Sequence, residues 1–286
     1  MTDAIELKNV SKHLGDFRID QMNLQIPKGY ITGFIGPNGA GKSTTIRLIM
    51  DLVKLDAGAI KIFGMDHQEA GKTARDRIGF VYPENVFYEN LTVEAIGKVV
   101  GGFYSKWDMS KFRQLCQDFS LPPRKKVKDL STGMKVKLSL AVALSHHADL
   151  IILDEPTSGL DPLVRSEILD LLYDLIQDQN KTVFFSSHIT TDLEKIADYV
   201  VLIQDGTIVM DEAKDDLLDR FRLVKGASDL LDADTRPLLA GLKETSAGFV
   251  GLTQEADTFH ELYGDKLLIE PASLEEIMVY TLKGGQ

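Results

Sequence analysis

The sequence predicts an α/β fold in which helices cover both faces of a parallel sheet. A strand, a glycine-rich loop and a helix follow one another over 30–53, strands and helices alternate again over 149–210, and several strands are almost entirely apolar. Strands that are buried on both faces have this composition. Because the texture of the sequence changes after Phe221, we expect a main domain over 1–220 and a small C-terminal α/β accessory domain over 221–286.

The N-terminal third of the main domain is predicted to be rich in strands. Residues 4–10 and 17–26 largely alternate between apolar and polar side chains, which is typical of half-buried strands. Residues 58–64 and 77–84 give two more predicted strands. We therefore expect a β-rich N-terminal subdomain.

The middle of the main domain is predicted to be helical. Helix-length runs occupy 92–107 and 109–119, and Pro122 and Pro123 interrupt the pattern after them. These runs predict a helical subdomain over about 88–148.

Alternating strands and helices return after this helical segment. The predicted elements are strands over 149–155 and 182–188 and helices over 163–179 and 190–198. A hairpin is predicted over 199–210, with Asp205 and Gly206 at its turn.

The C-terminal accessory domain is predicted to mix strands and helices. Its predicted strands span 222–226, 248–253 and 266–271, and its predicted helices span 236–242 and 273–284. Ser273 and Glu276 have the spacing of a capping box, which would start the last helix.

Composition limits the classes of partner and the compartment. The chain has 286 residues, 44% of them hydrophobic, a net charge of −11 and one cysteine, Cys116. The acidic balance argues against nucleic acid as a partner, and a single cysteine excludes an intramolecular disulfide. The sequence has no signal-peptide pattern and no apolar run long enough to span a bilayer. We therefore expect a cytoplasmic protein without a covalent membrane anchor, which reaches a membrane through a partner.

The segment GPNGAGKST over 36–44 has the pattern of a phosphate-binding loop, and it lies between a predicted strand and a predicted helix. Its glycines let backbone N–H groups wrap phosphate oxygens. Lys42 is expected to bridge the β- and γ-phosphates of a nucleotide, and the Ser43 hydroxyl is expected to bind Mg²⁺. The nucleotide-binding residues predicted in this loop are Gly36, Pro37, Asn38, Gly39, Ala40, Gly41, Lys42, Ser43 and Thr44.

Three further polar side chains follow two other apolar strands. Asp154 and Glu155 end the strand over 149–155, and His188 ends the strand over 182–188. Because the carboxyl ends of parallel strands meet at one edge of a sheet, we expect all three beside the phosphate-binding loop. Asp154 would then hold Mg²⁺, Glu155 would act as the general base toward an attacking water, and His188 would bond the γ-phosphate.

These motifs resemble those of the ATPase subunits of ABC transporters. GPNGAGKST, LSTGM, LIILDEPTSGLD and SSH are similar to the Walker A, signature, Walker B with D-loop, and switch-histidine motifs, and they occur in the family's order. The resemblance covers roughly residues 4–220 and implies a P-loop NTPase core of ABC ATPase type that hydrolyses ATP with Mg²⁺. The STGM signature and the short C-terminal appendix resemble bacterial exporter ATPases for drugs, antibiotics or antimicrobial peptides.

The resemblance also implies how the chain assembles. In ABC ATPases two subunits pack head to tail, as a homodimer or a heterodimer, and the signature turn of one caps the ATP held by the other. Ser131, Thr132 and Gly133 would form that turn here, at the head of an apolar helix. The implied partners are a second ATPase subunit and separate transmembrane permease subunits, which would keep the chain peripheral at the inner face of the cell membrane.

Three positions depart from the family pattern. Glu84 stands where a glutamine usually contacts Mg²⁺, and an ionised carboxylate offers acceptors alone. Leu14 stands where an aromatic side chain usually stacks on adenine, so His13 or Phe17 would have to substitute for it. Thr132 stands where glycine is common in the signature, which requires that this position does not need a positive φ.

Two interpretations stay open for the aromatic-rich segment over 86–107: helical core, or part of a groove that receives a membrane subunit.

Two other functions also fit the motifs. One is a soluble ABC ATPase that is not coupled to transport, which would carry a long coiled coil, zinc modules or two cassettes, and the sequence has none of these. The other is a sensor that binds ATP without hydrolysis, against which Glu155 argues.

Overall fold

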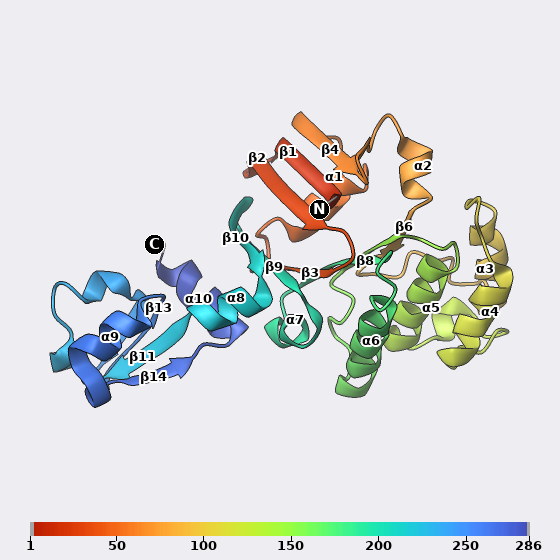
Figure 1. Ribbon diagram of the computed structural model, residues 1–286. Coiled ribbons are helices and arrows are strands. Elements are labelled where there is room, and N and C mark those ends of the chain that lie inside the picture. The colour runs from red at the N-terminus through yellow and green to blue at the C-terminus, as the bar shows by residue number, and fades with distance from the viewer. Residues whose placement is uncertain (1–2, 285–286) are drawn as a thin grey trace. The chain divides into compact units, whose positions relative to one another are not determined.

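The computed structural model describes residues 3–284 and is shown in Figure 1. It divides into two compact units, and the boundary lies between Asp211 and Glu212. The boundary expected from the sequence, after residue 220, lies at the end of helix α8 (Lys214–Arg220). Within residues 3–284, none of the helices combines the length and the apolar character needed to cross a membrane.

A four-stranded antiparallel sheet forms the N-terminal part of the first unit. Its order is β2-β1-β4-β5, with β1 at Asp3–Leu14, β2 at Phe17–Pro27, β4 at Ala57–Ile62 and β5 at Met65–Asp66. A two-residue turn joins β1 to β2, and Gly15 in this turn has a φ of 60°, which favours glycine. The turn pairs Leu14 with Phe17, so both residues lie at the same end of the hairpin.

The second sheet has six strands in the order β10-β9-β3-β8-β7-β6. The strands are β3 (Ile31–Ile35), β6 (Ile78–Val81), β7 (Leu150–Asp154), β8 (Thr182–Ser187), β9 (Tyr199–Gln204) and β10 (Thr207–Ala213). From β9 to β6 all neighbours run parallel, and β3, β7 and β8 are buried along their whole length. This confirms the predicted α/β fold with a parallel sheet. Asp205 and Gly206 form the predicted turn between β9 and β10, with φ values of 47° and 77°.

Four of the described helices in this unit lie in sequence outside the helical middle segment. They are α1 (Lys42–Ile49), α2 (Gly71–Arg75), α6 (Pro162–Leu175) and α7 (Thr190–Ile196). Helix α7 contacts β3 and β8, and α1 contacts β7. Asp161 caps α6 by accepting hydrogen bonds from the backbone N–H groups of Leu163 and Val164, and Pro162 occupies the first helical turn.

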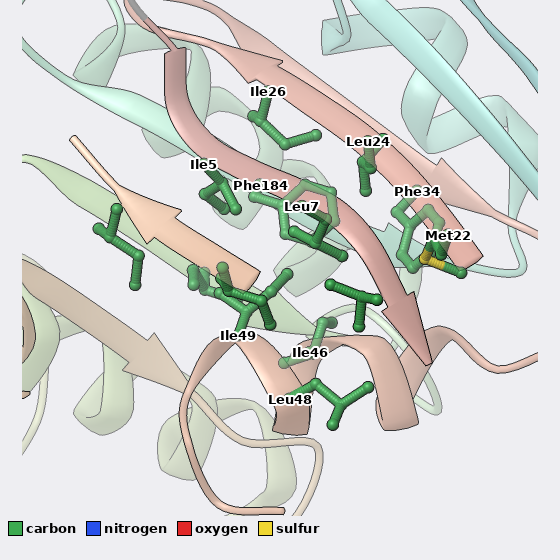
Figure 2. Packing of buried hydrophobic residues seen from close by; sticks show 14 of the residues in the cluster. Ile5, Leu7, Met22, Leu24, Ile26, Phe34, Ile46, Leu48, Ile49 and Phe184 are labelled. Carbon is green, nitrogen blue, oxygen red and sulfur yellow. The ribbon is translucent and has the colours of Figure 1, made fainter. Parts of the chain in front are cut away.

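One hydrophobic cluster joins α1 to both sheets. Figure 2 shows it, with side chains from β1 and β2 (Ile5, Leu7, Met22, Leu24, Ile26), from α1 (Ile46, Leu48, Ile49) and from the parallel sheet (Phe34, Phe184). The ring centroids of Phe34 and Phe184 lie 5.3 Å apart. Because the phosphate-binding loop leads directly into α1, this packing holds the loop in a fixed place relative to both sheets.

The middle segment is helical and has a core of its own. It contains α3 (Val93–Gly101), α4 (Met109–Asp118), the short η1 (Val127–Asp129) and α5 (Thr132–Leu144). Thr92, Asp108 and Ser131 cap the three longer helices by accepting bonds from backbone N–H groups. Gly97 of α3 allows a close approach to Phe112 of α4, since a Cβ at Gly97 would lie 2.3 Å from the phenyl ring.

Cys116 belongs to this helical core. Its side chain is buried, and the loss of hydration raises the pKa of its thiol to about 12. The thiol therefore stays protonated at neutral pH, as expected for a structural cysteine.

The C-terminal unit contains a second four-stranded antiparallel sheet, in the order β12-β13-β11-β14. The strands are β11 (Arg222–Gly226), β12 (Ala240–Thr245), β13 (Gly248–Thr253) and β14 (Leu268–Pro271). The helices are α8, α9 (Ala256–Tyr263) and α10 (Leu274–Gly284), with short helices at Ser228–Leu230, Arg236–Leu238 and Gly264–Lys266. A hydrophobic cluster in this unit contains Val224, Leu231, Leu239, Phe249, Phe259 and Leu267.

One predicted helix in this unit is wrong. The segment over 236–242 forms a short helical turn and then enters β12, which pairs with β13. Gly241 has a φ of 59°, which lies outside the right-handed helical region. Helix α9 has no counterpart among the predicted elements. The predicted capping box is confirmed, because Ser273 Oγ accepts from the Glu276 N–H at 3.2 Å and the Ser273 N–H donates to Glu276 Oε2 at 2.9 Å.

Phe184→Ala tests the packing of the cluster in Figure 2. Removing this fully buried ring should lower the free energy of unfolding by about 3–5 kcal/mol, which is the usual cost of a large-to-small change in a core. Urea denaturation followed by circular dichroism measures the loss. Phe103→Ala is the matched control, because Phe103 is 74% exposed, and it should change the stability by less than about 0.5 kcal/mol. Equal losses in the two variants would contradict the packing described.

Candidate functional site

The phosphate-binding loop connects β3 to α1 at the centre of the parallel sheet. Helix α1 begins at Lys42, and Gly41 at its N-cap has a φ of 114°. Gly36 is required for a different reason, since a Cβ there would lie 2.3 Å from the carbonyl oxygen of Ile203. The N-cap glycine has no side chain to bond the first N–H groups of the helix, which therefore remain suited to an anion.

Lys42 folds back over this loop. Its side chain is 6% exposed, and Nζ donates to the carbonyl oxygens of Gly36 at 2.7 Å and Pro37 at 3.3 Å. The same Nζ lies 3.3 Å from Oε1 of Glu155. These three oxygens satisfy a buried ammonium group that would otherwise be costly to desolvate.

Asp154 is the last residue of β7, and it is 3% exposed. Its Oδ1 accepts hydrogen bonds from Ser43 Oγ at 3.1 Å and from Ser186 Oγ at 2.7 Å. A hydroxyl and a carboxylate side by side are oxygen donors of the kind that Mg²⁺ takes together with phosphate and water oxygens. The residues present therefore fit the Mg²⁺ predicted at Ser43 and Asp154.

Glu155 and His188 form a pair beside Lys42. His188 Nδ1 lies 2.6 Å from Glu155 Oε2, and the His188 N–H donates to the same oxygen at 3.3 Å. Glu155 has a φ of 52°, so its backbone leaves the extended course of β7 directly after Asp154. The predicted convergence is thus present, with the loop after β3, the two acids at the end of β7 and the histidine after β8 at one edge of the sheet.

These side chains surround a cavity of about 840 Å³. Its lining residues are Leu14, Phe17, Asn38, Gly39, Gly41, Lys42, Ser43, Thr44, Pro83, Glu84, Glu155, Ser158 and His188. A concave site with convergent polar groups at the carboxyl edge of a parallel sheet is the usual location of a ligand in this class of fold.

The residues considered for base stacking differ in their surroundings. Leu14 and Phe17, which pair across the β1–β2 hairpin, both line the cavity. Phe17 lies against the phosphate-binding loop, since a Cβ at Gly41 would be 2.8 Å from its Cζ atom. His13 instead donates its backbone N–H to Asp56 Oδ2 at 2.8 Å. The Lys12 ammonium, together with this His13 amide, lowers the pKa of Asp56 to about 2, so the anchoring carboxylate stays ionised at neutral pH.

The signature residues lie at the start of α5, apart from the residues that line this cavity. Ser131 Oγ accepts from the Met134 N–H at 3.3 Å. Thr132 is the first residue of α5 and is not among the described residues with a positive φ, so the threonine is compatible with this backbone. Gly133 packs against α6, because a Cβ there would lie 2.8 Å from Cγ1 of Val164.

Other residues at the site were not singled out from the sequence. Pro83 and Ser158 line the cavity, and Ser186 bonds Asp154. Asp192 of α7 is 1% exposed and accepts from Thr157 Oγ1 at 2.7 Å and from Arg165 Nε at 2.5 Å, which ties α6 and α7 to the segment after Glu155. Ser186 is the first residue of the SSH motif, and Thr157 lies in the EPTSGLD motif. Membership in these motifs was the sequence signal that could have identified the two residues.

Comparison with known sequences identifies related proteins. The sequence profile described as "ABC transporter" matches residues 19–158, and an AAA domain profile matches residues 126–191. The bacitracin transport ATP-binding protein BcrA of Bacillus licheniformis is 35% identical over 226 residues, which are 78% of this chain and 74% of that protein. The ABC transporter ATP-binding protein YtrB of Bacillus subtilis is 30% identical over 226 residues, which are 79% of this chain and 77% of that protein.

Comparison with solved structures gives the same kind of match. The structure of an ATP-binding subunit of an ABC transporter superposes with a TM-score of 0.67 at 27% identity, over 76% of this chain and 92% of that one. The ATP-binding cassette MJ0796, in a dimeric post-hydrolysis state bound to ADP and phosphate, superposes with a TM-score of 0.65 at 26% identity, over 73% of this chain and 98% of that one.

Leu14→Tyr tests where the base of the nucleotide lies. If Leu14 faces the base, the added ring should tighten ATP binding by about 1–3 kcal/mol, the size of one base–aromatic stack. Isothermal titration with a non-hydrolysable ATP analogue measures the gain. Leu14→Met, which adds no ring, is the matched control and should leave the affinity unchanged. An affinity of Leu14→Tyr equal to that of the wild type would assign the base to the Phe17 side instead.

Glu84→Gln tests whether Glu84, which lines the cavity where the family usually has glutamine, binds Mg²⁺. If the carboxylate binds Mg²⁺, its neutral replacement should raise the Mg²⁺ concentration for half-maximal hydrolysis severalfold, while nucleotide binding in EDTA stays the same. A titration of phosphate release against Mg²⁺ measures this. Glu89→Gln removes an exposed charge from the same segment outside the cavity lining and should leave the titration unaltered. An unchanged midpoint in Glu84→Gln would show that this carboxylate does not contact the metal.

Proposed function

The chain belongs to the ATP-binding subunits of ABC transporters and is an ATPase, and we propose that it drives export through separate membrane subunits as a head-to-tail dimer around two ATP molecules. The relative BcrA is named for bacitracin transport, which supports export of an antibiotic or antimicrobial peptide. The dimeric state of the MJ0796 cassette supports the same assembly here.

The observation that carries the proposal is the contact between the phosphate-binding loop and the acidic end of β7. Ser43 Oγ lies 3.1 Å from Asp154 Oδ1, and Lys42 Nζ lies 3.3 Å from Glu155 Oε1. Backbone N–H groups over 39–44 and the Lys42 ammonium would bind the ATP phosphates, and Ser43, Asp154 and Glu84 would hold Mg²⁺. When bound, Mg²⁺ neutralises part of the charge on the β- and γ-phosphates.

The contacts of Lys42 bear on how nucleotide binding would prepare hydrolysis. Lys42 bonds to loop carbonyls and to Glu155. ATP phosphates are stronger partners for the ammonium, so their arrival would draw Lys42 away from Glu155 and free that carboxylate to accept a proton.

Hydrolysis then follows as an in-line displacement. The oxygen of a water molecule attacks the γ-phosphorus while Glu155 takes its proton, and the bond from the γ-phosphorus to the bridging oxygen breaks with its electron pair going to ADP. His188 Nδ1 lies 2.6 Å from Glu155 Oε2, and we propose that this histidine bonds the γ-phosphate.

The signature turn supports a dimer with shared sites. Ser131, Thr132 and Gly133 lie apart from the lining of their own chain's cavity, yet Ser131 and Thr132 are exposed at the start of a 13-residue helix. The positive end of a helix dipole with free donors suits an anion. A second subunit packed head to tail would bring that subunit's ATP to this turn, so each of the two sites would contain residues of both chains.

An exposed apolar surface after Glu84 supports coupling to a membrane subunit. Four apolar side chains of this segment are exposed: Val86 (55%), Tyr88 (74%), Val99 (45%) and Phe103 (74%). Val93 and Ile96 of α3 are instead buried in the helical core. The helical-core interpretation therefore describes the buried residues, and the docking groove is a proposal for the exposed ones. The exposed four would receive a segment of a separate permease subunit, which would keep the protein peripheral at the inner face of the membrane.

The alternatives gain no support from these observations. The relatives named above are transport ATP-binding proteins, which favours transport over a soluble ATPase that is not coupled to it. A sensor that does not hydrolyse ATP would not need Glu155 beside Lys42 and His188.

Glu155→Gln tests the proposed function. This variant keeps the size of the base but cannot accept the proton, so ATP should bind without being cleaved. Because ATP would join the two subunits, the variant should form a stable dimer with ATP and remain a monomer with ADP. Size-exclusion chromatography with light scattering measures the mass of the complex, and a malachite-green assay measures phosphate release.

A second substitution in the same chain provides the control. Adding Ser131→Arg should abolish the dimer, because the bulky side chain blocks the signature turn, while nucleotide binding to the phosphate-binding loop is retained. Dimerisation of the free subunit would be contradicted by a Glu155→Gln protein that stays monomeric with ATP at a protein concentration on the order of tens of micromolar. Wild-type protein that releases no phosphate would contradict hydrolysis by the subunit alone.

A further inference from the structure

Ser186 occupies a central place in the parallel sheet. It lies on β8, which has β3 on one side and β7 on the other, and it is aligned with Phe34 and Asp154 on these neighbours. Its side chain is 0% exposed and follows the apolar run Val183, Phe184 and Phe185. A buried hydroxyl needs hydrogen-bond partners, because desolvation without them is costly.

The partners of Ser186 are the two acidic residues at the end of β7. Its hydroxyl donates to Asp154 Oδ1 at 2.7 Å and accepts from the backbone N–H of Glu155 at 3.0 Å. The carbonyl oxygen of Ser186 also accepts from this N–H, at 3.2 Å. One residue thus bonds both the carboxylate predicted to hold Mg²⁺ and the backbone of the predicted base.

The bond to Asp154 differs in kind from the bond that Ser43 makes to the same oxygen. Ser43 lies in the phosphate-binding loop, and a bound Mg²⁺ would take up its hydroxyl. Ser186 lies on a buried strand, outside the phosphate-binding loop. It can therefore keep the Asp154 carboxylate in one orientation both before and after the metal arrives, which lowers the entropic cost of binding.

The bond to Glu155 supports an unusual backbone conformation. Glu155 has a φ of 52°, which is unfavourable for a residue with a side chain and persists where the surroundings hold it. The two oxygens of Ser186 hold its N–H. This conformation turns the side chain toward Lys42 and His188, which it contacts at 3.3 Å and 2.6 Å.

We infer that Ser186 is a positioning residue, whose buried hydroxyl fixes the Asp154 carboxylate for Mg²⁺ and the Glu155 backbone for base catalysis. The inference rests on the proposed function, because it concerns the nucleotide and metal at the same site. A role in stability alone is the competing explanation. Thr182 provides the comparison, since it is equally buried at the opposite end of β8 and its Oγ1 accepts from the Gly29 N–H at 3.1 Å.

Binding of a non-hydrolysable ATP analogue to the full chain, with saturating Mg²⁺ and in EDTA, tests the inference together with thermal unfolding. Ser186→Ala should lose affinity in Mg²⁺ about tenfold, the size of one hydrogen bond to a charged group, and keep its affinity in EDTA. Ser186→Thr retains the hydroxyl and should restore the Mg²⁺-dependent affinity. Thr182→Val, the matched control, should lower the melting temperature like Ser186→Ala but keep the wild-type response to Mg²⁺.

The outcomes separate the competing explanations. A Ser186→Ala protein with the wild-type gain in affinity from Mg²⁺ and a melting temperature lowered as in Thr182→Val would overturn the inference. If Ser186→Ala is too unstable to measure, Ser186→Cys keeps a side chain of similar size with a weak donor and should show a loss in the same direction. A wild-type chain that does not bind the analogue with Mg²⁺ would overturn the proposed function itself, and this inference with it.

Discussion

The chemistry of this protein depends on three adjacent parallel strands that end at one edge of a sheet. Strands β3, β8 and β7 are neighbours and are buried along their whole length, so their carboxyl ends cannot shift relative to one another without disturbing the core. The phosphate-binding loop and His188 follow two of these ends, and Asp154 and Glu155 stand at the third. As a result, residues more than thirty positions apart in the sequence make contacts of 2.6–3.3 Å. The hydrophobic cluster of Figure 2 adds α1 to this arrangement and so fixes the loop.

The charged and hydroxyl groups of the site satisfy one another. Lys42 bonds two loop carbonyls and Glu155, while Glu155 also contacts His188, and Asp154 accepts from two hydroxyls. Such a network holds the Lys42 ammonium at the proposed phosphate site without leaving a buried charge unpaired. Under the proposed function, the ATP phosphates would replace the loop carbonyls and Glu155 as partners of Lys42.

Much of this arrangement could be predicted from the sequence, because phosphate and metal chemistry demand particular residue types at particular spacings. The loop over 36–44, the acids after β7 and the histidine after β8 are such cases. Other features depend on three-dimensional neighbours. Ser186 is a small residue at the end of an apolar strand, and its role follows from its register with Asp154. The turn between β1 and β2 decides that Phe17, and not His13, lines the cavity. The segment over 236–242 is predicted as a helix, but Gly241 has a positive φ there and the chain enters β12.

The central claim is that the signature turn of one subunit completes the ATP site of another, and complementation between inactive subunits tests it most directly. Lys42→Ala removes the phosphate-binding lysine, and Ser131→Arg blocks the signature turn, so each chain alone should fail to hydrolyse ATP. A mixed dimer has one site that carries both changes and one site that carries neither. The account predicts that mixing the two purified chains restores phosphate release, in proportion to the mixed dimers isolated through a tag on one chain. Isolated mixed dimers that bind ATP but release no phosphate would contradict it.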